Sequence, residues 1–328
     1  MNVPITLACW DYDRMRALMD GQVRPEGVEL TYLPLMMPEP AFRMQKHGEF
    51  EVSEMSLSWY SRTVAANPRP FIALPVFPSR MFRHSSVYVN SESGIEKPSD
   101  LAGRRVGCPE YQMTAAVWIK GILADRYDLP VDSVHYLTGG LEQPGRIETP
   151  MTLPSNIDVR AIPTDKTLSS MLANREIDAL YTAHAPSSFG DGTDRVRRLW
   201  ANPAEEEQAY YEATGIFPIM HVIVIRGDVY ASHPWLAQSM MKAFEAAKQI
   251  AYQALTETTA LKYMLPWQVH SAEQMYELMG SDPFSYGLEG NEATLATFLR
   301  YSYEQGLTPR QFEPEELFAP ETLDTFRI

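Results

Sequence analysis

Short apolar runs alternate with amphipathic stretches along most of this 328-residue chain. Apolar runs of strand length, bounded by turn residues, lie at 5–10, 28–33, 50–56, 85–90, 104–109, 134–137, 159–163, 177–183 and 221–227. Between them, apolar residues recur with a helical period at 14–20, 41–47 and 113–127, and a long helical region from 234 to 306 follows the last strand. Alternating strands and helices of this kind predict an α/β protein.

A weak internal repeat indicates how these elements are grouped. Residues 42–60 and 168–186 both run from a helix, through a turn that contains a glutamate, into a buried strand and a polar loop. The repeat predicts two similar α/β lobes. We expect a discontinuous first lobe, residues 1–100 and 222–328, which includes the C-terminal helical region. A continuous second lobe, residues 101–221, would lie between these segments, so that the chain crosses between the lobes twice.

Composition and charge narrow the class of protein. The 28 Lys and Arg residues against 42 Asp and Glu residues leave a formal net charge of −14, which argues against a nucleic-acid partner. The N-terminal residues lack the pattern of a secretion signal, and no run of 18 apolar residues occurs, so we expect a cytoplasmic protein without a membrane partner. Cys9 and Cys108 match no metal or redox spacing and are expected to be buried thiols. Glycine-rich phosphate loops and nucleotide fingerprints are absent, so we expect no organic cofactor.

Two histidines mark the beginnings of predicted strands. His84 precedes the strand at 85–90, and His221 opens the strand at 221–227. Ligands of open α/β sheets bind beyond the carboxyl ends of the strands. The loops that meet this description lie at 10–13, 54–60, 109–114 and 181–188. We therefore expect His84 and His221 at the floor of a cleft between the lobes; the alternative is that each histidine is a hydrogen-bonded core residue.

Five stretches of the chain resemble the 4,5-dihydroxyphthalate decarboxylase family. They are LACWDYDRMRALMDGQVRPEGVELTYL at 7–33, RMFRHSSVYVN at 80–90, EYQMTAAVWIKGILADRY at 110–127, LTGGLEQPGR at 137–146 and PIMHVIVIRGDVYASHPWL at 218–236. The resemblance implies the two-lobed fold of type II periplasmic solute-binding proteins, with an interlobe cleft and two crossover strands. It also implies an enzyme of phthalate degradation that removes one carboxylate from 4,5-dihydroxyphthalate to give protocatechuate.

The chemistry that the resemblance implies selects candidate residues. An aryl carboxylate leaves as CO₂ after its ring carbon is protonated, so the site needs groups that transfer protons and an anchor for the retained carboxylate. Histidine titrates near neutrality, and an arginine fork binds a carboxylate through two parallel hydrogen bonds. The candidate catalytic residues are His221, His84 and His184, and the candidate substrate-binding residues are Arg83, Arg80, Arg146, Tyr111, Ser56 and Glu54. For His184 and Arg146 the alternative is a solvated surface side chain, and for Arg83 it is a structural ion pair.

Other classes of site and protein stay open. A catechol chelates metals well, but a metal cluster would have to combine His84, His184, His221 and Glu54 over long sequence distances, so we expect no metal. The expected partner is a small aromatic dicarboxylate, and the aromatic residues beyond His270 are compatible with a homo-oligomer. The alternative functions are a solute-binding protein that captures an aromatic acid for a transporter and another enzyme on the same fold.

Overall fold

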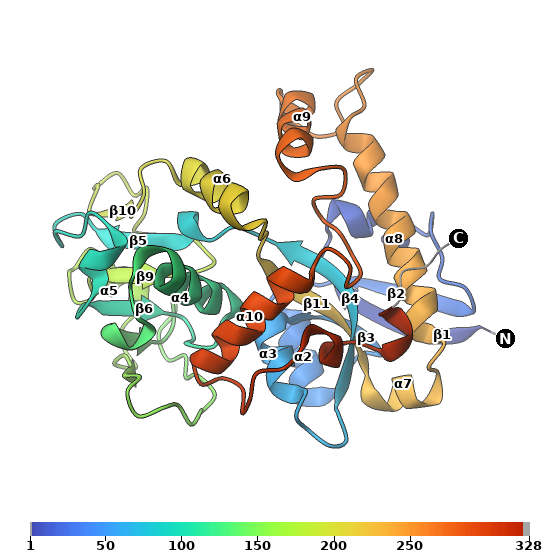
Figure 1. Cartoon of the computed structure of the whole chain (residues 1–328), viewed down its shortest axis with the longest axis horizontal. Coiled ribbons are helices and arrows are strands. Elements are labelled where there is room, and N and C mark those ends of the chain that lie inside the picture. Colours follow the sequence, from blue (N-terminus) through green and yellow to red (C-terminus); the bar gives the residue numbers. More distant parts are fainter. Residues whose placement is uncertain (1, 324–328) are drawn as a thin grey trace. The chain divides into compact units, whose positions relative to one another are not determined.

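The computed structural model describes residues 2–323, and these form two compact units. Unit 1 consists of residues 2–80, 219–296 and 312–323, and unit 2 of residues 81–218 and 297–311. Each unit contains its own β-sheet (Figure 1). Within the described part of the chain, none of the helices combines the length and the apolar character that crossing a bilayer requires.

Unit 1 is built on a mixed five-stranded sheet in the order β2-β1-β3-β11-β4. Its strands are β1 (Val3–Cys9), β2 (Val28–Pro34), β3 (Val52–Ser56), β4 (Phe71–Arg80) and β11 (Ile219–Arg226). β1 is parallel to β2 and β3, whereas β11 is antiparallel to β3 and β4. In Figure 1 the yellow strand β11 thus lies between two blue strands that precede it by about 140 residues or more. The carboxyl ends of β1 and β3 and the beginning of β11 therefore lie at the same end of the sheet.

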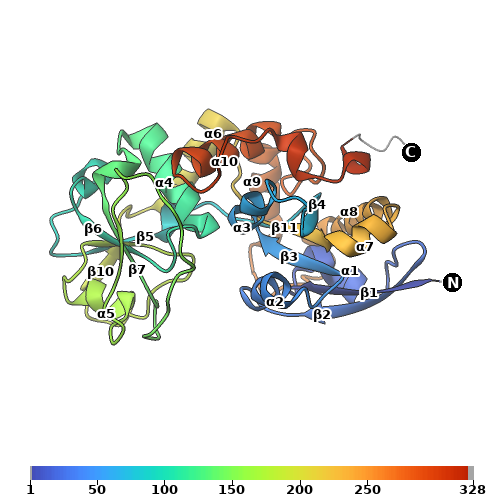
Figure 2. The same ribbon diagram turned by 90° about the horizontal axis from the view of Figure 1, so that it is seen from below.

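Helices from both sequence segments belong to unit 1. They are α1 (Arg16–Met19), α2 (Glu39–His47), α3 (Leu57–Thr63), α7 (Gly227–Ser232), α8 (Leu236–Leu255) and α9 (Gln268–Met279). The longest, α8, packs against α1 and β4, and α7 precedes it on the same side of the sheet (Figure 2). Its buried residues, including Met240, Phe244, Ala247 and Ala251, recur every three or four positions, as expected for one apolar face of an amphipathic helix.

β4 is one of two strands that the apolar pattern did not predict; the other is the three-residue β10 (Val196–Arg198) of unit 2. Pro75 and Pro78 interrupt the sequence of β4, and proline cannot donate a backbone hydrogen bond to a neighbouring strand. β4 tolerates both because it lies at the edge of the sheet, where one side of the strand needs no strand partner. Its pairing with β11 also shifts register on both sides of His221.

Unit 2 contains a six-stranded sheet in the order β10-β5-β9-β6-β7-β8. Its strands are β5 (Val87–Asn90), β6 (Arg105–Cys108), β7 (His135–Thr138), β8 (Val159–Ala161), β9 (Ala179–Tyr181) and β10 (Val196–Arg198). Its helices are α4 (Thr114–Tyr127), α5 (Leu168–Ala173), α6 (Pro203–Thr214) and the later part of α10 (Glu292–Glu304). α4 and α5 lie on opposite sides of the sheet (Figure 2). Tyr88 and Leu180 pack with α5, whereas the neighbouring residues along each strand face the other side.

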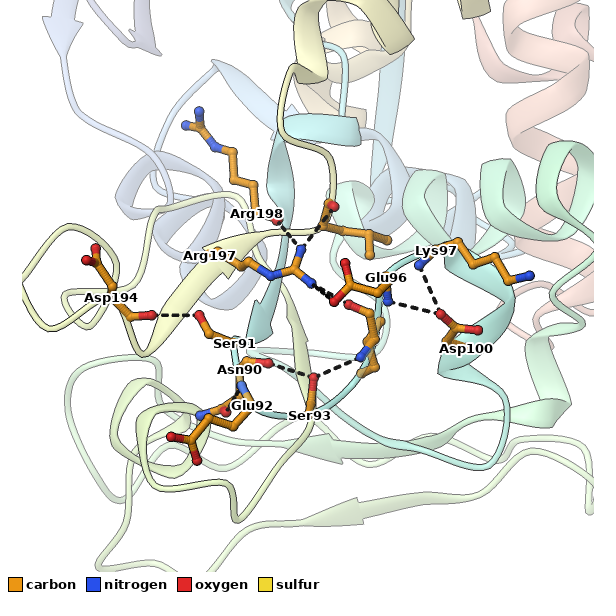
Figure 3. A network of polar contacts seen from close by, with 12 residues as sticks. Asn90, Ser91, Glu92, Ser93, Glu96, Lys97, Asp100, Asp194, Arg197 and Arg198 are labelled. Atoms are coloured by element: carbon orange, nitrogen blue, oxygen red, sulfur yellow. Dashed lines mark hydrogen bonds and ion pairs between the residues drawn. The ribbon is translucent and has the colours of Figure 1, made fainter.

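The units differ from the expected lobes at residues 81–100, which belong to unit 2. The reason is strand pairing, since β5 is hydrogen-bonded to both β9 and β10. Polar contacts hold the turn after β5 in the same unit (Figure 3). The Asn90 amide donates to the Leu172 carbonyl at 2.8 Å, the Ser91 hydroxyl donates to the Asp194 carbonyl at 2.6 Å, and Arg197 donates to the Ile95 carbonyl at 2.6 Å.

Two further differences remain. Residues 219–221, which include His221, were expected in the second lobe but pair with β3 and β4 in unit 1. Residues 297–311 were expected in the first lobe and lie in unit 2. The rings of Phe298 and Tyr301 pack against Trp118 of α4, with centroids 5.5 and 5.7 Å away. Tyr301 also lies directly over Gly121, where an added Cβ would overlap its ring. The aromatic side of α10 therefore covers the apolar surface of α4, which the sequence pattern alone did not pair with it.

Candidate active site

His221 is the third residue of β11, between β3 and β4. Its cross-strand neighbours are Ser56 on β3 and Ser79 on β4. The register shifts on β4 flank His221, and such bulges often re-aim side chains beside active sites. The His221 side chain is 19% exposed, so the strands hold the imidazole while part of it reaches solvent. The histidine therefore lies inside the strand, two residues from its beginning, and not at the strand head that we expected.

Glu54 of β3 is a buried carboxylate surrounded by four hydrogen-bond donors. Its Oε1 accepts a hydrogen bond from Nδ1 of His221 at 2.6 Å and from the hydroxyl of Tyr12 at 2.7 Å. Its Oε2 accepts from the backbone N–H of Trp10 at 3.1 Å and from the thiol of Cys9 at 3.4 Å. The Glu54 side chain is 0% exposed, so we assign it a positioning role and not the substrate contact expected from the sequence.

The topology of the sheet brings these groups together. β1 and β3 are adjacent and parallel, so the segments that follow them begin at the same end of the sheet. After β1 this segment is the predicted ligand-binding loop at 10–13, whereas residues 54–60, also predicted as a loop, form the end of β3 and the first turn of α3. β11 runs antiparallel to β3, so its first residues lie at that same end of the sheet. One carboxylate therefore links three strands of unit 1.

The surroundings of Glu54 determine the protonation of the dyad. Burial opposes the negative charge of Glu54, but the nearby His221 and the hydrogen bonds from His221, Tyr12 and the Trp10 N–H outweigh it and hold the pKa of Glu54 below its ordinary value. Burial and the Glu54 charge raise the pKa of Tyr12 and of Cys9. Both groups therefore stay protonated near neutral pH and donate to an ionised carboxylate.

An ionised Glu54 fixes the tautomer of His221. Because Glu54 is an acceptor only, Nδ1 of His221 carries the hydrogen in their shared hydrogen bond. In the neutral imidazole, Nε2 then holds the lone pair, and over residues 2–323 this nitrogen has no hydrogen-bond partner. A carboxylate that orients histidine in this way also stabilises the imidazolium. The dyad can therefore take up and release a proton at Nε2.

Arg14 is a cation that packs over Tyr12 and forms an ion pair with Asp13 at 3.0 Å, and sequence reasoning did not find it. Its guanidinium carbon lies 4.3 Å from the ring centroid of Tyr12 and 4.7 Å from that of Phe284. Its Nε donates to the Pro78 carbonyl at 2.7 Å, one residue before Ser79. We had placed Arg14 in a helix, although it directly follows the predicted loop at 10–13, and that position was the signal that could have found it.

Arg80, a predicted carboxylate ligand, is 8% exposed and is held by unit 1 itself. Its Nη2 donates to the Ser285 carbonyl at 2.8 Å and to the Asn291 side-chain oxygen, and its guanidinium stacks on Phe77 at 5.1 Å. These contacts fasten β4 to the segment before α10. They favour a structural role for Arg80.

We expect Arg80→Met to lower the free energy of unfolding by about 2–4 kcal/mol, because the variant leaves buried acceptors without their charged donor. Affinity for an aromatic dicarboxylate should stay within about threefold. Urea unfolding and ligand titration measure the two quantities. Unchanged stability together with a tenfold loss of affinity would restore Arg80 to the ligand site.

His84 and Arg83 lie in a buried part of unit 2. His84 opens a short 3-10 turn before β5, is 2% exposed and has no hydrogen-bond partner at either ring nitrogen within residues 2–323. The rings of Trp200, Tyr210 and Tyr127 surround it at centroid distances of 5.2, 5.4 and 6.2 Å. Burial lowers the pKa of His84 to about 4 and that of Arg83 to about 10. His84 is therefore neutral at pH 7, and nothing within unit 2 supports its predicted catalytic role.

The low pKa of His84 predicts a loss of stability in acid. The unfolded chain takes up a proton at His84 below pH of about 6.5, whereas the folded protein does so only near pH 4. Stability should therefore fall as the pH drops through this window and should not depend on His84 above it. We expect the loss between pH 7.5 and 4.5 to be about 2–3 kcal/mol smaller in His84→Phe than in the wild type. Urea unfolding at both pH values tests this, and identical losses would contradict it.

The other predicted site residues of unit 2 lie in different environments. His184 is exposed in the loop after β9. Arg146 forms an ion pair with Glu110 at 2.6 Å and is 37% exposed. Tyr111 is 0% exposed, and its hydroxyl donates to the Gln305 carbonyl at 3.3 Å. Tyr111 is therefore a core residue, and its expected contact with a catechol oxygen is not available in this environment.

Within either unit, no three or more His, Cys, Asp or Glu side chains of residues 2–323 are arranged to hold a metal ion. The cluster considered from the sequence takes His84 and His184 from unit 2, and His221 and Glu54 from unit 1.

Two relatives place the chain among known proteins. It is 39% identical over 328 residues to a protein of Comamonas testosteroni named 4,5-dihydroxyphthalate decarboxylase, covering 100% of this chain and 99% of that protein. The chain belongs to the 4,5-dihydroxyphthalate decarboxylase family. A second decarboxylase of this name, from Pseudomonas putida, is 40% identical over 210 residues, which cover 64% of this chain and 81% of that protein. No protein-family model matches the chain.

Solved structures show the fold of this decarboxylase-family chain. The periplasmic aliphatic sulphonate binding protein SsuA of Escherichia coli matches with a TM-score of 0.54 at 12% identity, covering 98% of this chain and 99% of that one. The alkanesulfonate-binding protein SsuA of Xanthomonas axonopodis pv. citri, bound to MOPS, matches with a TM-score of 0.53 at 13% identity, covering 98% of both chains. These matches confirm the periplasmic-binding-protein-like fold class that the resemblance implied.

Proposed function

We propose that this member of the family is a carboxy-lyase that converts 4,5-dihydroxyphthalate to protocatechuate and CO₂. The names of its two relatives support the substrate. The observation within the chain that carries the proposal is the hydrogen bond between Nδ1 of His221 and the buried, ionised Glu54. This pair gives the site a histidine whose second nitrogen can exchange a proton with a ligand.

The reaction needs one proton and no external oxidant or reductant. The ring carbon that bears the leaving carboxylate accepts a proton, and the hydroxyl para to it stabilises the resulting cation. The bond between ring and carboxylate then breaks, its electron pair returns to the ring, and CO₂ departs. One dianion and one proton thus become one monoanion and CO₂.

We assign this proton transfer to Nε2 of His221. Glu54 stabilises the imidazolium before transfer and holds the ring orientation through Nδ1. Tyr12 and the Trp10 N–H keep Glu54 ionised. Arg14, which lies over the Tyr12 ring and is paired with Asp13, is the proposed cation for a dianionic substrate. The proposal requires neither a metal nor an organic cofactor, since acid–base groups supply each step. It also excludes a nucleic-acid partner, which the net charge of −14 disfavours.

The test is direct assay of the purified protein. We expect release of CO₂ and stoichiometric appearance of protocatechuate from 4,5-dihydroxyphthalate, at equal rates with and without a chelator such as EDTA. Tight binding of the dicarboxylate without turnover would instead indicate a solute-binding protein. Loss of activity in EDTA that added metal restores would contradict the metal-free reaction.

A further inference from the structure

The indole of Trp10 is an exposed apolar surface that packs against Tyr12, which is itself a hydrogen-bond donor to Glu54. Trp10 is 40% exposed although it directly follows β1, a strand whose last residues are buried. Its backbone N–H and the His221 imidazole bind the two oxygens of the same Glu54 carboxylate. The Trp10 backbone and the His221 imidazole are therefore both hydrogen-bonded directly to the Glu54 carboxylate.

The backbone of Trp10 is held on both sides. Its N–H donates to Glu54 at 3.1 Å, while its carbonyl accepts from the Tyr32 hydroxyl at 2.8 Å and from the Tyr12 N–H at 2.9 Å. The indole packs edge-on against the Tyr12 ring, with centroids 5.2 Å apart and an interplanar angle of 79°. Such contacts restrict the orientation of the indole without burying it, as a preformed binding surface requires.

An exposed tryptophan forgoes the free energy that burial of its large ring would contribute. Polar contacts alone would fix this loop equally well with a smaller or polar side chain, because they use only the backbone of Trp10. These backbone contacts therefore do not require an indole at this position, and the packing of the indole against the Tyr12 ring leaves a large part of it exposed. A planar aromatic ligand that stacks on the indole would bury it, on the loop whose Trp10 N–H and Tyr12 hydroxyl bind the Glu54 carboxylate.

We propose that Trp10 forms the stacking surface for the substrate ring, so that the site selects planar aromatic dicarboxylates over non-planar ones. This proposal rests on the function proposed above and names a specificity-determining residue for it. Stacking contributes through the π-face of the ligand, so it distinguishes two ligands that carry the same pair of carboxylates on different rings. Phthalate is planar and lacks the hydroxyls of the substrate, whereas cis-cyclohexane-1,2-dicarboxylate has a puckered, saturated ring.

The experiment measures binding of these two ligands by calorimetry to the wild type, Trp10→Leu and Trp10→Phe. We expect Trp10→Leu to weaken phthalate binding about tenfold and to change binding of the saturated ligand less than twofold. Trp10→Phe, which retains an aromatic face, should stay within about threefold of the wild type for phthalate. Trp235→Leu is the matched control, since Trp235 is 43% exposed on the same unit and packs over Gly27 away from the dyad contacts.

The outcomes separate this inference from the proposed function. Equal phthalate affinity in the wild type and Trp10→Leu, or an equal loss for both ligands, would overturn the stacking role even if the wild type releases CO₂. Loss specific to phthalate in a protein that releases no CO₂ would support the stacking role and overturn the decarboxylase. A wild type that binds neither phthalate nor 4,5-dihydroxyphthalate would overturn both.

Discussion

His221→Asn is expected to lower the single-turnover rate of CO₂ release about a hundredfold or more, while phthalate binding stays within about threefold of the wild type. An asparagine amide can still donate to Glu54, so the buried carboxylate keeps a hydrogen-bond donor. It cannot take up and release a proton near neutral pH, and a positioned acid–base group contributes about 10²–10⁴ in rate. Rapid-quench measurement of CO₂ beside calorimetric titration of phthalate separates the chemical step from binding.

The matched control is His47→Asn, which alters an exposed histidine at the end of α2 in the same unit. Its rate and affinity should equal those of the wild type. If His221→Asn folds, binds phthalate and turns over at a near-normal rate, His221 is a structural residue. The assignment of proton transfer to its Nε2 would then be wrong.

Glu54→Gln should have a comparable effect on rate and a larger one on stability. The substitution removes the charge that stabilises the imidazolium, and replacing an orienting carboxylate by an amide costs up to about 10⁴ in turnover elsewhere. It also turns an –NH₂ group toward donors, whichever way the amide is rotated, because both carboxylate oxygens accept hydrogen bonds. We expect at least a hundredfold slower CO₂ release and a loss of about 2–4 kcal/mol in unfolding free energy.

A double variant makes this prediction sharper. If Glu54 acts through His221, the losses in the rate of CO₂ release should not multiply, because the effects of residues that act as a unit are not additive. The double variant His221→Asn/Glu54→Gln should then release CO₂ at a rate within about threefold of that of the slower single variant. Two independent roles would instead multiply the losses. Glu51→Gln is the control, since Glu51 accepts a hydrogen bond from the Thr6 N–H at 2.9 Å but has no contact with the dyad among its described bonds.

Local sequence patterns determined much of the frame of this protein. The apolar periodicity predicted most of the strands and the α/β class, because a buried strand or helix face requires apolar residues at a regular spacing. It predicted ligand-binding segments at 10–13 and 54–60, and Tyr12 and Glu54 of these segments belong to the hydrogen-bond network of His221. Residues 54–60, however, form the end of β3 and the start of α3 and not a loop. The apolar pattern also selected His221 as a polar residue in an otherwise apolar run, and the long motifs identified the family.

Tertiary structure alone decided how these parts combine. Glu54 and His221 are 167 residues apart, and only the order and register of β3 and β11 make their side chains neighbours. The same dependence on strand pairing assigned residues 81–100 to unit 2 and allowed two prolines in β4. His84 looked equivalent to His221 in sequence, yet the aromatic rings around it come from α4, α6 and the segment before α6 and keep it neutral. Apolar periodicity indicates that one face of a helix or strand is buried. The residues that pack against that face come from distant parts of the chain. These neighbouring residues determine the charge and the chemistry of a histidine.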